Sequence, residues 1–191
     1  MKNILFLQSS VLGAHSQTRP LVQAVAAALA QAHPQATQRI RDLGHTPLPH
    51  LRGEHLAQAP AEAQEALAEL KQADALVIGA PMYNFGVPST LKAWLDHVLK
   101  AGETFCYTEA GPQGMLQGKK VLLVISTGGV YSEGAYKSYD FVEPYLRAAL
   151  GFIGITDVTA VRVEGGAVNA EQGAASAQAA KQAALDWAAR S

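Results

Sequence analysis

The sequence predicts an α/β fold in which helices cover both faces of a parallel sheet. Two observations predict it. Short apolar runs alternate with amphipathic helical patterns along the chain, and such alternation indicates parallel pairing of the strands. The apolar runs are also continuous and rich in branched residues, which is typical of strands buried on both faces.

The first half of the chain is predicted to contain three strands and two helices. Residues 4–7 form an apolar strand, and an apolar stripe over 21–29 predicts a helix. Residues 39–41 alternate polar and apolar, which fits an edge strand. A short stripe over 66–70 predicts the second helix, and residues 75–78 form the third strand.

The second half repeats the pattern. The stripe over 91–99 follows helical spacing closely, and residues 121–125 form a strand. A further helix covers 142–150, and a strand follows within 155–163. The Ala-rich stretch 170–190 contains no proline and a single glycine, so helix propensity predicts the last helix.

These elements form one predicted domain over residues 1–191. Five parallel strands fit the flavodoxin-like doubly wound order 2-1-3-4-5 better than a six-stranded dinucleotide-binding fold. Two stretches, 44–60 and 101–118, are too polar or too rich in glycine for regular elements and are expected to be loops.

Composition excludes several classes of protein. The 15 Lys and Arg residues balance 16 Asp and Glu residues, so no basic excess is available for a nucleic-acid backbone. The single cysteine excludes an intramolecular disulfide and a cysteine-cluster metal site. No apolar stretch predicts a membrane span, and the first apolar run is too short for a signal-peptide core. A cytoplasmic protein is expected.

Isolated reactive side chains do not form a recognisable catalytic motif. His45, His50 and His55 are spaced by five residues, which does not suit metal binding on one helix face, and we interpret them as loop residues. His97 falls between apolar-stripe positions and is expected on the exposed side of its helix. Nothing in the sequence indicates a base beside Cys106. We therefore expect no metal and nominate no catalytic side chain.

Ligands of doubly wound sheets bind beyond the carboxyl ends of the strands, so three loops are candidates for the site. The loop over residues 9–18 leads into the first helix, whose N-terminus favours an anion. Ser10, Ser16 and Thr18 add hydroxyl donors suited to a single phosphate. The alternative is that Ser16 or Thr18 only caps the helix.

The loop over residues 80–89 places Tyr83 and Phe85 around Asn84, between two prolines and before a glycine. This composition suits a flat heteroaromatic ring, whose edge the amide of Asn84 would face. The alternative is that Met82 and Phe85 belong to the core and that Asn84 is a turn residue.

The loop that follows the fourth predicted strand, 121–125, begins at Ser126 and contains Gly128 and Gly129. Two adjacent glycines let the backbone lie against a ring edge and offer N–H groups to ring oxygens. An ordinary turn is the alternative. Together, a phosphate pocket beside a flat slot predicts a mononucleotide with a wide heterocycle, and FMN fits best.

The chain resembles the FMN-dependent NADH-azoreductase family of flavodoxin-like quinone and azo-compound reductases. The resemblance runs nearly end to end, and Pro-Met-Tyr-Asn-Phe at 81–85 is its most specific part. By resemblance, the phosphate side comprises Ser10, Ser16, Gln17 and Thr18, and the ring side comprises Met82, Tyr83, Asn84, Phe85, Ser126, Thr127, Gly128 and Gly129. Some members have Arg where Thr127 stands, and the 44–60 segment is shorter than in some relatives.

The implied activity is two-electron transfer from NADH or NADPH to a quinone or an azo compound in a ping-pong order. The cofactor supplies the chemistry, and the protein supplies position and electrostatics. By analogy, Phe105, Tyr131 and Phe152 would form the walls of the substrate slot. The alternatives are a flavodoxin-type electron carrier, against which the net charge of −1 argues, and a non-catalytic flavin sensor.

A homodimer with its active sites at the subunit interface is also expected. The charged fraction of 16% is low, and the helix over 91–99 is rich in bulky apolar residues. The long 101–118 excursion would place Phe105 and Tyr107 over the flavin of the partner. The alternative is that this excursion folds over its own subunit.

Overall fold

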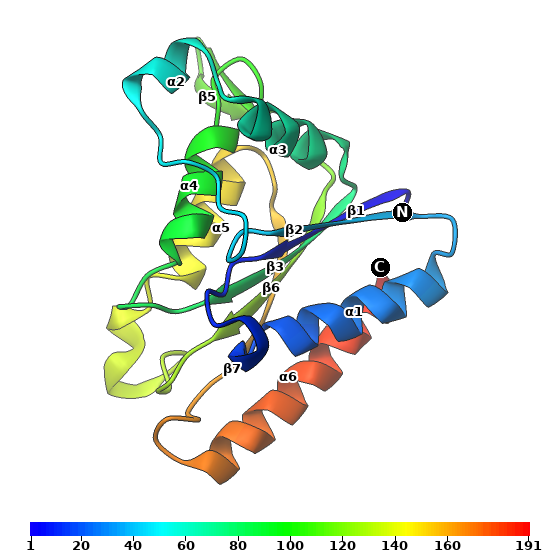
Figure 1. Cartoon of the computed structure of the whole chain (residues 1–191), viewed down its shortest axis with the longest axis vertical. Helices are drawn as coiled ribbons and strands as arrows, with labels where there is room; N and C mark the ends of the chain where they lie inside the picture. The colour runs from blue at the N-terminus through cyan, green and yellow to red at the C-terminus, as the bar shows by residue number, and fades with distance from the viewer.

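The computed structural model describes residues 1–191 and contains a five-stranded parallel sheet between two layers of helices (Figure 1). The strands lie in the order β2-β1-β3-β6-β7, and every neighbouring pair is parallel. Counted within this sheet, the order is 2-1-3-4-5, which confirms the predicted fold class. The strands are β1 (Asn3–Gln8), β2 (Thr37–Asp42), β3 (Ala75–Pro81), β6 (Lys120–Ser126) and β7 (Asp157–Val163).

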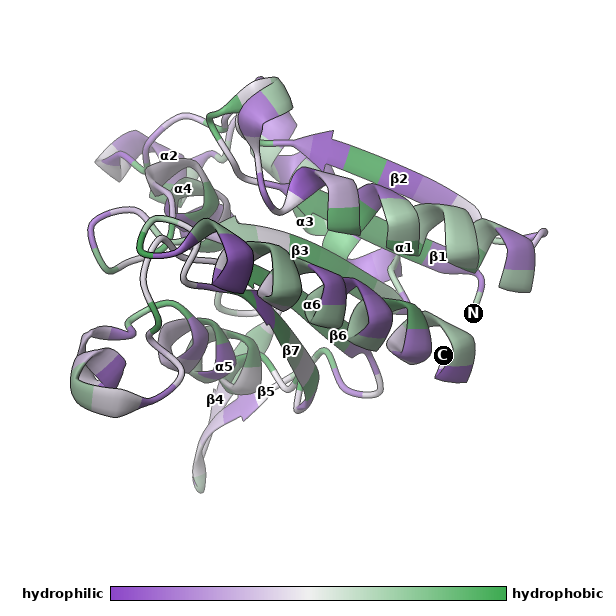
Figure 2. Cartoon of the chain, turned by 90° about the horizontal axis from the view of Figure 1, so that it is seen from below, coloured by the Kyte–Doolittle hydropathy of each residue, from purple (hydrophilic) through white to green (hydrophobic).

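Helices cover both faces of this sheet. One face packs against α1 (Arg19–Ala32) and α6 (Ala170–Arg190), which lie side by side in Figures 1 and 2. The other face packs against α3 (Ala61–Gln72), α4 (Ser89–Val98) and α5 (Glu143–Phe152). No helix of the chain combines the length and the apolar character needed to cross a bilayer.

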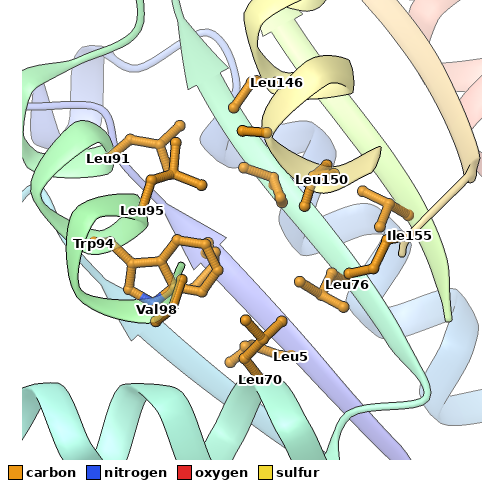
Figure 3. Close-up of a cluster of buried hydrophobic side chains, with 14 of the residues drawn as sticks. Leu5, Leu70, Leu76, Leu91, Trp94, Leu95, Val98, Leu146, Leu150 and Ile155 are labelled. Carbon is orange, nitrogen blue, oxygen red and sulfur yellow. The ribbon is translucent and has the colours of Figure 1, made fainter. Parts of the chain in front are cut away.

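Alternation along the strands divides the core into two clusters. Leu5 and Leu76, which are partners in the β1–β3 register, point to the α4 side and lie near Trp94, as Figure 3 shows. Their neighbours Ile4 and Phe6 point to the α1 and α6 side. Full burial stabilises each large apolar side chain by about 1.5–3 kcal/mol, so both faces must remain covered. With both faces covered, the space left for a ligand lies at the ends of the strands, and in such sheets it lies at the carboxyl ends.

The two stretches predicted as loops contain regular elements, so that prediction was wrong. The 101–118 stretch folds into an antiparallel hairpin of β4 (Phe105–Thr108) and β5 (Gly111–Gly114). Gly111 turns the chain at a φ of 108°, and a Cβ at Gly114 would lie 2.1 Å from the Gly154 nitrogen. Glycine at position 114 therefore permits the hairpin to pack closely against the residues that follow α5. The glycine-rich composition of this stretch is the reason that no strand was predicted there. The 44–60 stretch contains α2 (Gly53–Ala57).

Two predictions about histidines were also wrong. His97 is buried, with 6% of its surface exposed, and its Nε2 lies 2.9 Å from the Pro49 carbonyl oxygen. His55 lies on α2 rather than in a loop, and its ring centroid is 5.5 Å from that of His97. The 44–60 segment covers the side of α4 that carries His97. Local periodicity marks this side as exposed because the pattern contains no information about contacts with distant parts of the chain.

Candidate cofactor-binding site

Three loops at the carboxyl edge of the sheet surround a cavity of about 570 Å3. Small-molecule sites are ordinarily about 300–1,000 Å3, so this volume suits a cofactor. The cavity brings together seven of the predicted cofactor ligands, namely Ser10, Gln17, Met82, Tyr83, Ser126, Thr127 and Gly128. The rest of its wall is formed by Leu12, Pro81 and Val163, and by small residues of the β7–α6 loop and of α6 that the sequence did not predict.

The loop between β1 and α1 forms the end of the cavity that is predicted to bind an anion. Ser16 and Thr18 are buried, and their hydroxyl oxygens lie 3.2 Å apart. Ser16 Oγ accepts a hydrogen bond of 3.1 Å from the Arg19 amide, so it caps α1 as one alternative held. The amides of Gln17 and Thr18 donate no hydrogen bond within the chain. Unpaired amides at a helix N-terminus favour an anion, so capping by Ser16 leaves donors available for one.

Tyr83 joins this end of the cavity to the second loop. Its hydroxyl lies 3.4 Å from Ser10 Oγ and accepts a hydrogen bond of 3.3 Å from the Val11 amide. The sequence resemblance assigns Tyr83 to the ring side, whereas its hydroxyl in the structure contacts the phosphate-side loop. The tyrosine therefore fixes the distance between the two ends of the cavity.

Asn84 and Phe85 occupy a strained turn at the tip of the β3–α4 loop. Their φ angles are 49° and 71°, a left-handed conformation that is uncommon for residues other than glycine. Tyr83 and Gly86 exchange two backbone hydrogen bonds across the turn, of 3.0 and 3.1 Å. Asn84 is thus a turn residue, yet its exposed side chain makes no hydrogen bond within the chain and is free to meet a ligand. Strain of this kind is typical of functional sites.

Gly128 and Gly129 present unpaired backbone donors in the third loop. Their carbonyl oxygens accept hydrogen bonds from the amides of Ala167, at 2.9 Å, and Gly165, at 3.2 Å. Their own N–H groups donate to no atom of the chain. The β7–α6 loop therefore holds this dipeptide in place through its carbonyls and leaves two donors for a ligand.

The structure does not bring the three predicted slot residues together within one chain. The Tyr131 ring lies 6.3 Å from that of Phe85, beside the strained turn. Phe105 is buried and packs 4.6 Å from Phe152, and neither lines the cavity. Phe152 ends α5 while Glu143 begins it, which separates the two groups by about 15 Å at 1.5 Å per residue.

Sequence reasoning also missed two exposed tyrosines near Phe85. The Tyr139 ring lies 5.5 Å from Phe85, and the Tyr136 ring lies 6.2 Å from Tyr131. The spacing of three residues between these tyrosines was the available signal, because a 3-10 helix (Gly134–Tyr139) places such residues on one side.

A buried ion cluster lies behind the third loop. Arg162 on β7 contacts three carboxylates, those of Asp140, Glu143 and Glu164. Burial raises the pKa of the Glu143 carboxyl, but hydrogen bonds from Arg162 and Arg147 outweigh burial and lower it below its ordinary value. Burial alone would lower the pKa of Arg162, and the hydrogen bonds from its guanidinium to Glu143 and Asp140 raise it instead. Glu143 and Arg162 are therefore ionised at neutral pH.

A helix N-terminus with unpaired amides, beside a cavity at the carboxyl ends of parallel strands, is typical of flavodoxin-like proteins that bind mononucleotides. Residues 2–188 match the family described by its flavodoxin-like fold, and the chain belongs to that family. The resemblance predicted from the sequence is thereby confirmed.

Relatives with assigned names are similar over most of their length. An FMN-dependent NADH:quinone oxidoreductase from Xanthomonas euvesicatoria is 50% identical over 166 residues, which cover 85% of this chain and 84% of that protein. A protein of the same name from Hyphomonas neptunium is 47% identical over 176 residues, covering 86% and 85%.

Solved structures show the same architecture. An azoreductase from Bacillus anthracis superposes with a TM-score of 0.92 at 28% identity and covers all of both chains. An FMN-dependent NADH-azoreductase from the same organism, in complex with FMN, has a TM-score of 0.87 at 25% identity, covering 100% of this chain and 99% of that one.

Proposed function

We propose that this chain is an FMN-dependent oxidoreductase that uses NADH to reduce quinones and azo compounds. One observation carries the proposal: a single cavity joins the anion-binding end at α1 to the unpaired donors of the third loop. The named relatives are FMN-dependent NADH:quinone oxidoreductases, and a structural neighbour of the chain binds FMN.

The residues present fit FMN. A single phosphate needs a few convergent donors, and Ser16, Thr18 and the free amides of Gln17 and Thr18 supply them without a basic side chain. The amides of Gly128 and Gly129 suit the carbonyl-bearing edge of a flat ring. The remaining predicted ligands on both sides are proposed for the same roles, and the strained Asn84–Phe85 turn would border the ring.

When bound, FMN supplies two-electron chemistry, accepting a hydride equivalent from the nicotinamide and passing two electrons to the acceptor. The chain contributes position and charge. The fixed N–H groups of Gly128 and Gly129 would hold the edge of the ring and would stabilise negative charge there, because they need no reorganisation. NADH and the acceptor would occupy one slot in turn, which is a ping-pong order, and Tyr131 would border that slot.

We also propose a homodimer in which each hairpin completes the site of the other chain. Tyr107 near the hairpin tip is 73% exposed, whereas Phe105 is buried beneath it. Figure 1 shows the hairpin and the segment around Tyr139 at opposite ends of α5. The hairpin of one chain is therefore too far from the ring-side loops of the same chain to border its site. Tyr107 and Phe152 would instead border the site of the partner chain. Light scattering tests this: the expected mass is twice 20.1 kDa.

The experiment that tests the function is spectroscopic. Purified chain loaded with FMN is mixed with NADH without oxygen, and the flavin absorbance is followed. Bleaching within seconds, and recovery when a benzoquinone is added, are expected. Binding of FMN without bleaching would instead identify an electron carrier or a flavin sensor, and no spectral or thermal response to FMN would refute cofactor binding. The single cysteine suits a reducing compartment, and we propose that the enzyme is cytoplasmic.

A further inference from the structure

Residues 131–141, here called the aromatic segment, connect the third loop to α5. Residues 132–139 of this segment are all exposed, so they have little burial of their own to hold them. The segment nevertheless places the rings of Tyr131 and Tyr139 beside Phe85, and the ring of Tyr136 packs against both tyrosines. Something outside the segment must therefore position it.

Glu164 anchors the first end of the aromatic segment. Its carboxylate is buried, with 9% of the side chain exposed. Oε1 accepts hydrogen bonds from the amides of Tyr131, at 3.0 Å, and Ser132, at 3.1 Å, and Oε2 accepts one of 2.5 Å from Ser132 Oγ. Hydrogen bonds to a charged acceptor are about twice as strong as neutral ones, so this is a firm attachment.

Arg162 anchors the second end. Its Nη2 donates to the Asp140 carboxylate, whose other oxygen accepts the Val142 amide at 3.0 Å and so starts α5. Its Nη1 donates to Glu164 Oε1 at 3.3 Å, which joins the two anchors. Arg162 belongs to β7, a strand of the central sheet, and Glu164 directly follows the last residue of that strand.

We propose that Glu164 and Arg162 are positioning residues that hold the aromatic segment at the ring side of the site and so determine how the acceptor binds. The inference rests on the proposed function for its catalytic consequence, whereas the anchoring is a property of the chain alone. Neither side chain lines the cavity, so both act through their neighbours rather than on a reacting atom. Besides the segment, Glu164 Oε1 accepts a hydrogen bond of 3.4 Å from the hydroxyl of Thr127, which does line the cavity.

Removing Glu164 should loosen the segment without unfolding the chain. The cluster contains the carboxylates of Asp140, Glu143 and Glu164 against the guanidiniums of Arg162 and Arg147. Glu164→Ala leaves equal numbers of both signs, so no charge is stranded. Glu164→Gln keeps an acceptor for the two amides and a donor for Ser132 Oγ, and it should restore most of the anchoring.

Trypsin measures the anchoring in the apo chain, because Lys137 lies within the exposed part of the segment. We expect Glu164→Ala to raise the rate of cleavage after Lys137 about tenfold, with cleavage after Lys181 unchanged. Glu164→Gln should remain close to wild type. The matched control Glu171→Ala removes an exposed glutamate that has no ion pair and should change neither rate. Ser132→Ala, which removes a single hydrogen bond from an exposed residue, should raise the Lys137 rate about two- to tenfold.

Steady-state kinetics at saturating FMN measure the consequence for the reaction. We expect the KM for a benzoquinone to rise about fivefold or more in Glu164→Ala, with a smaller change in kcat, because the bordering rings are displaced while the carbonyls of Gly128 and Gly129 keep their hydrogen bonds from the β7–α6 loop. Equal cleavage after Lys137 in Glu164→Ala and Glu171→Ala, or parallel increases at Lys137 and Lys181, would overturn the anchoring. An unchanged KM would overturn its catalytic role. A wild-type chain that binds no FMN would overturn the proposed function and this catalytic role together, and the trypsin rates would still decide the anchoring.

Discussion

Replacing Gly173 with alanine tests how α6 supports the ring side of the site. Gly173 lies in the first turn of α6, and a Cβ there would lie 2.5 Å from the Gly166 Cα and 3.1 Å from its nitrogen. The β7–α6 loop must therefore shift. Because amides of this loop bind the carbonyls of Gly128 and Gly129, the shift should also move the two free donors.

Two free-energy contributions of opposite sign determine the stability of the Gly173→Ala variant. Alanine is favoured over glycine within a helix by up to about 1 kcal/mol. Overpacking ordinarily costs about 1–3 kcal/mol, and here the obstructing atoms are backbone, which moves less easily than the end of a side chain. We therefore expect Gly173→Ala to lower the free energy of unfolding by about 1–2 kcal/mol and to weaken FMN binding about tenfold.

Urea unfolding and flavin fluorescence titration measure the two effects. The matched control is Gly53→Ala, in the first turn of α2, where an added Cβ meets nothing within 4 Å. The control should be neutral or stabilising by up to about 1 kcal/mol and should leave FMN affinity unchanged. If Gly173→Ala were as stable as the control and bound FMN as wild type does, the supporting role of α6 would be refuted.

Three further predictions follow from the site. Asn84→Ala and Asn84→Gly should both weaken FMN binding by about 1–3 kcal/mol without unfolding the chain; because glycine tolerates the φ of 49°, normal binding by the glycine variant would assign Asn84 to the turn alone. The pKa of Glu143 lies below its ordinary value in the folded chain, so its contribution to stability is present above about pH 4.3 and is lost as the pH falls through the folded pKa. Between about pH 5 and 3, the urea midpoint of wild type should therefore fall more steeply than that of Glu143→Gln, and parallel curves would contradict this. Tyr107→Ala should raise the acceptor KM while leaving the thermal midpoint unchanged, since the ring is exposed in the single chain; unchanged kinetics would argue against a shared site.

Much of the site was predictable because strand direction determines which loops meet. Once 4–7, 75–78 and 121–125 are parallel strands, the loops after them must share one edge of the sheet. Ser10, Met82 and Gly128 accordingly line one cavity. Their roles as cofactor ligands stay a prediction until binding is measured.

The aromatic slot could not be predicted in the same way. Phe105 and Phe152 are separated by 47 positions along the chain, and their pairing depends on how a hairpin packs against the end of α5. The hairpin itself was hidden because its second strand, Gly111–Gly114, lacks apolar residues with β propensity.

The sequence by itself determined the sheet, its strand order and the loops that form the site, because periodicity and alternation are local properties that burial enforces. Only the tertiary structure decided which backbone donors have no partner within the chain, as at Gly128 and Gly129. It also decided which side chains position the loops around the site. Glu164 looks unremarkable in the sequence, yet it binds two amides more than thirty residues earlier in the chain. Hydrogen-bond partners so far apart are set by packing, and the chain between them leaves no periodic signal.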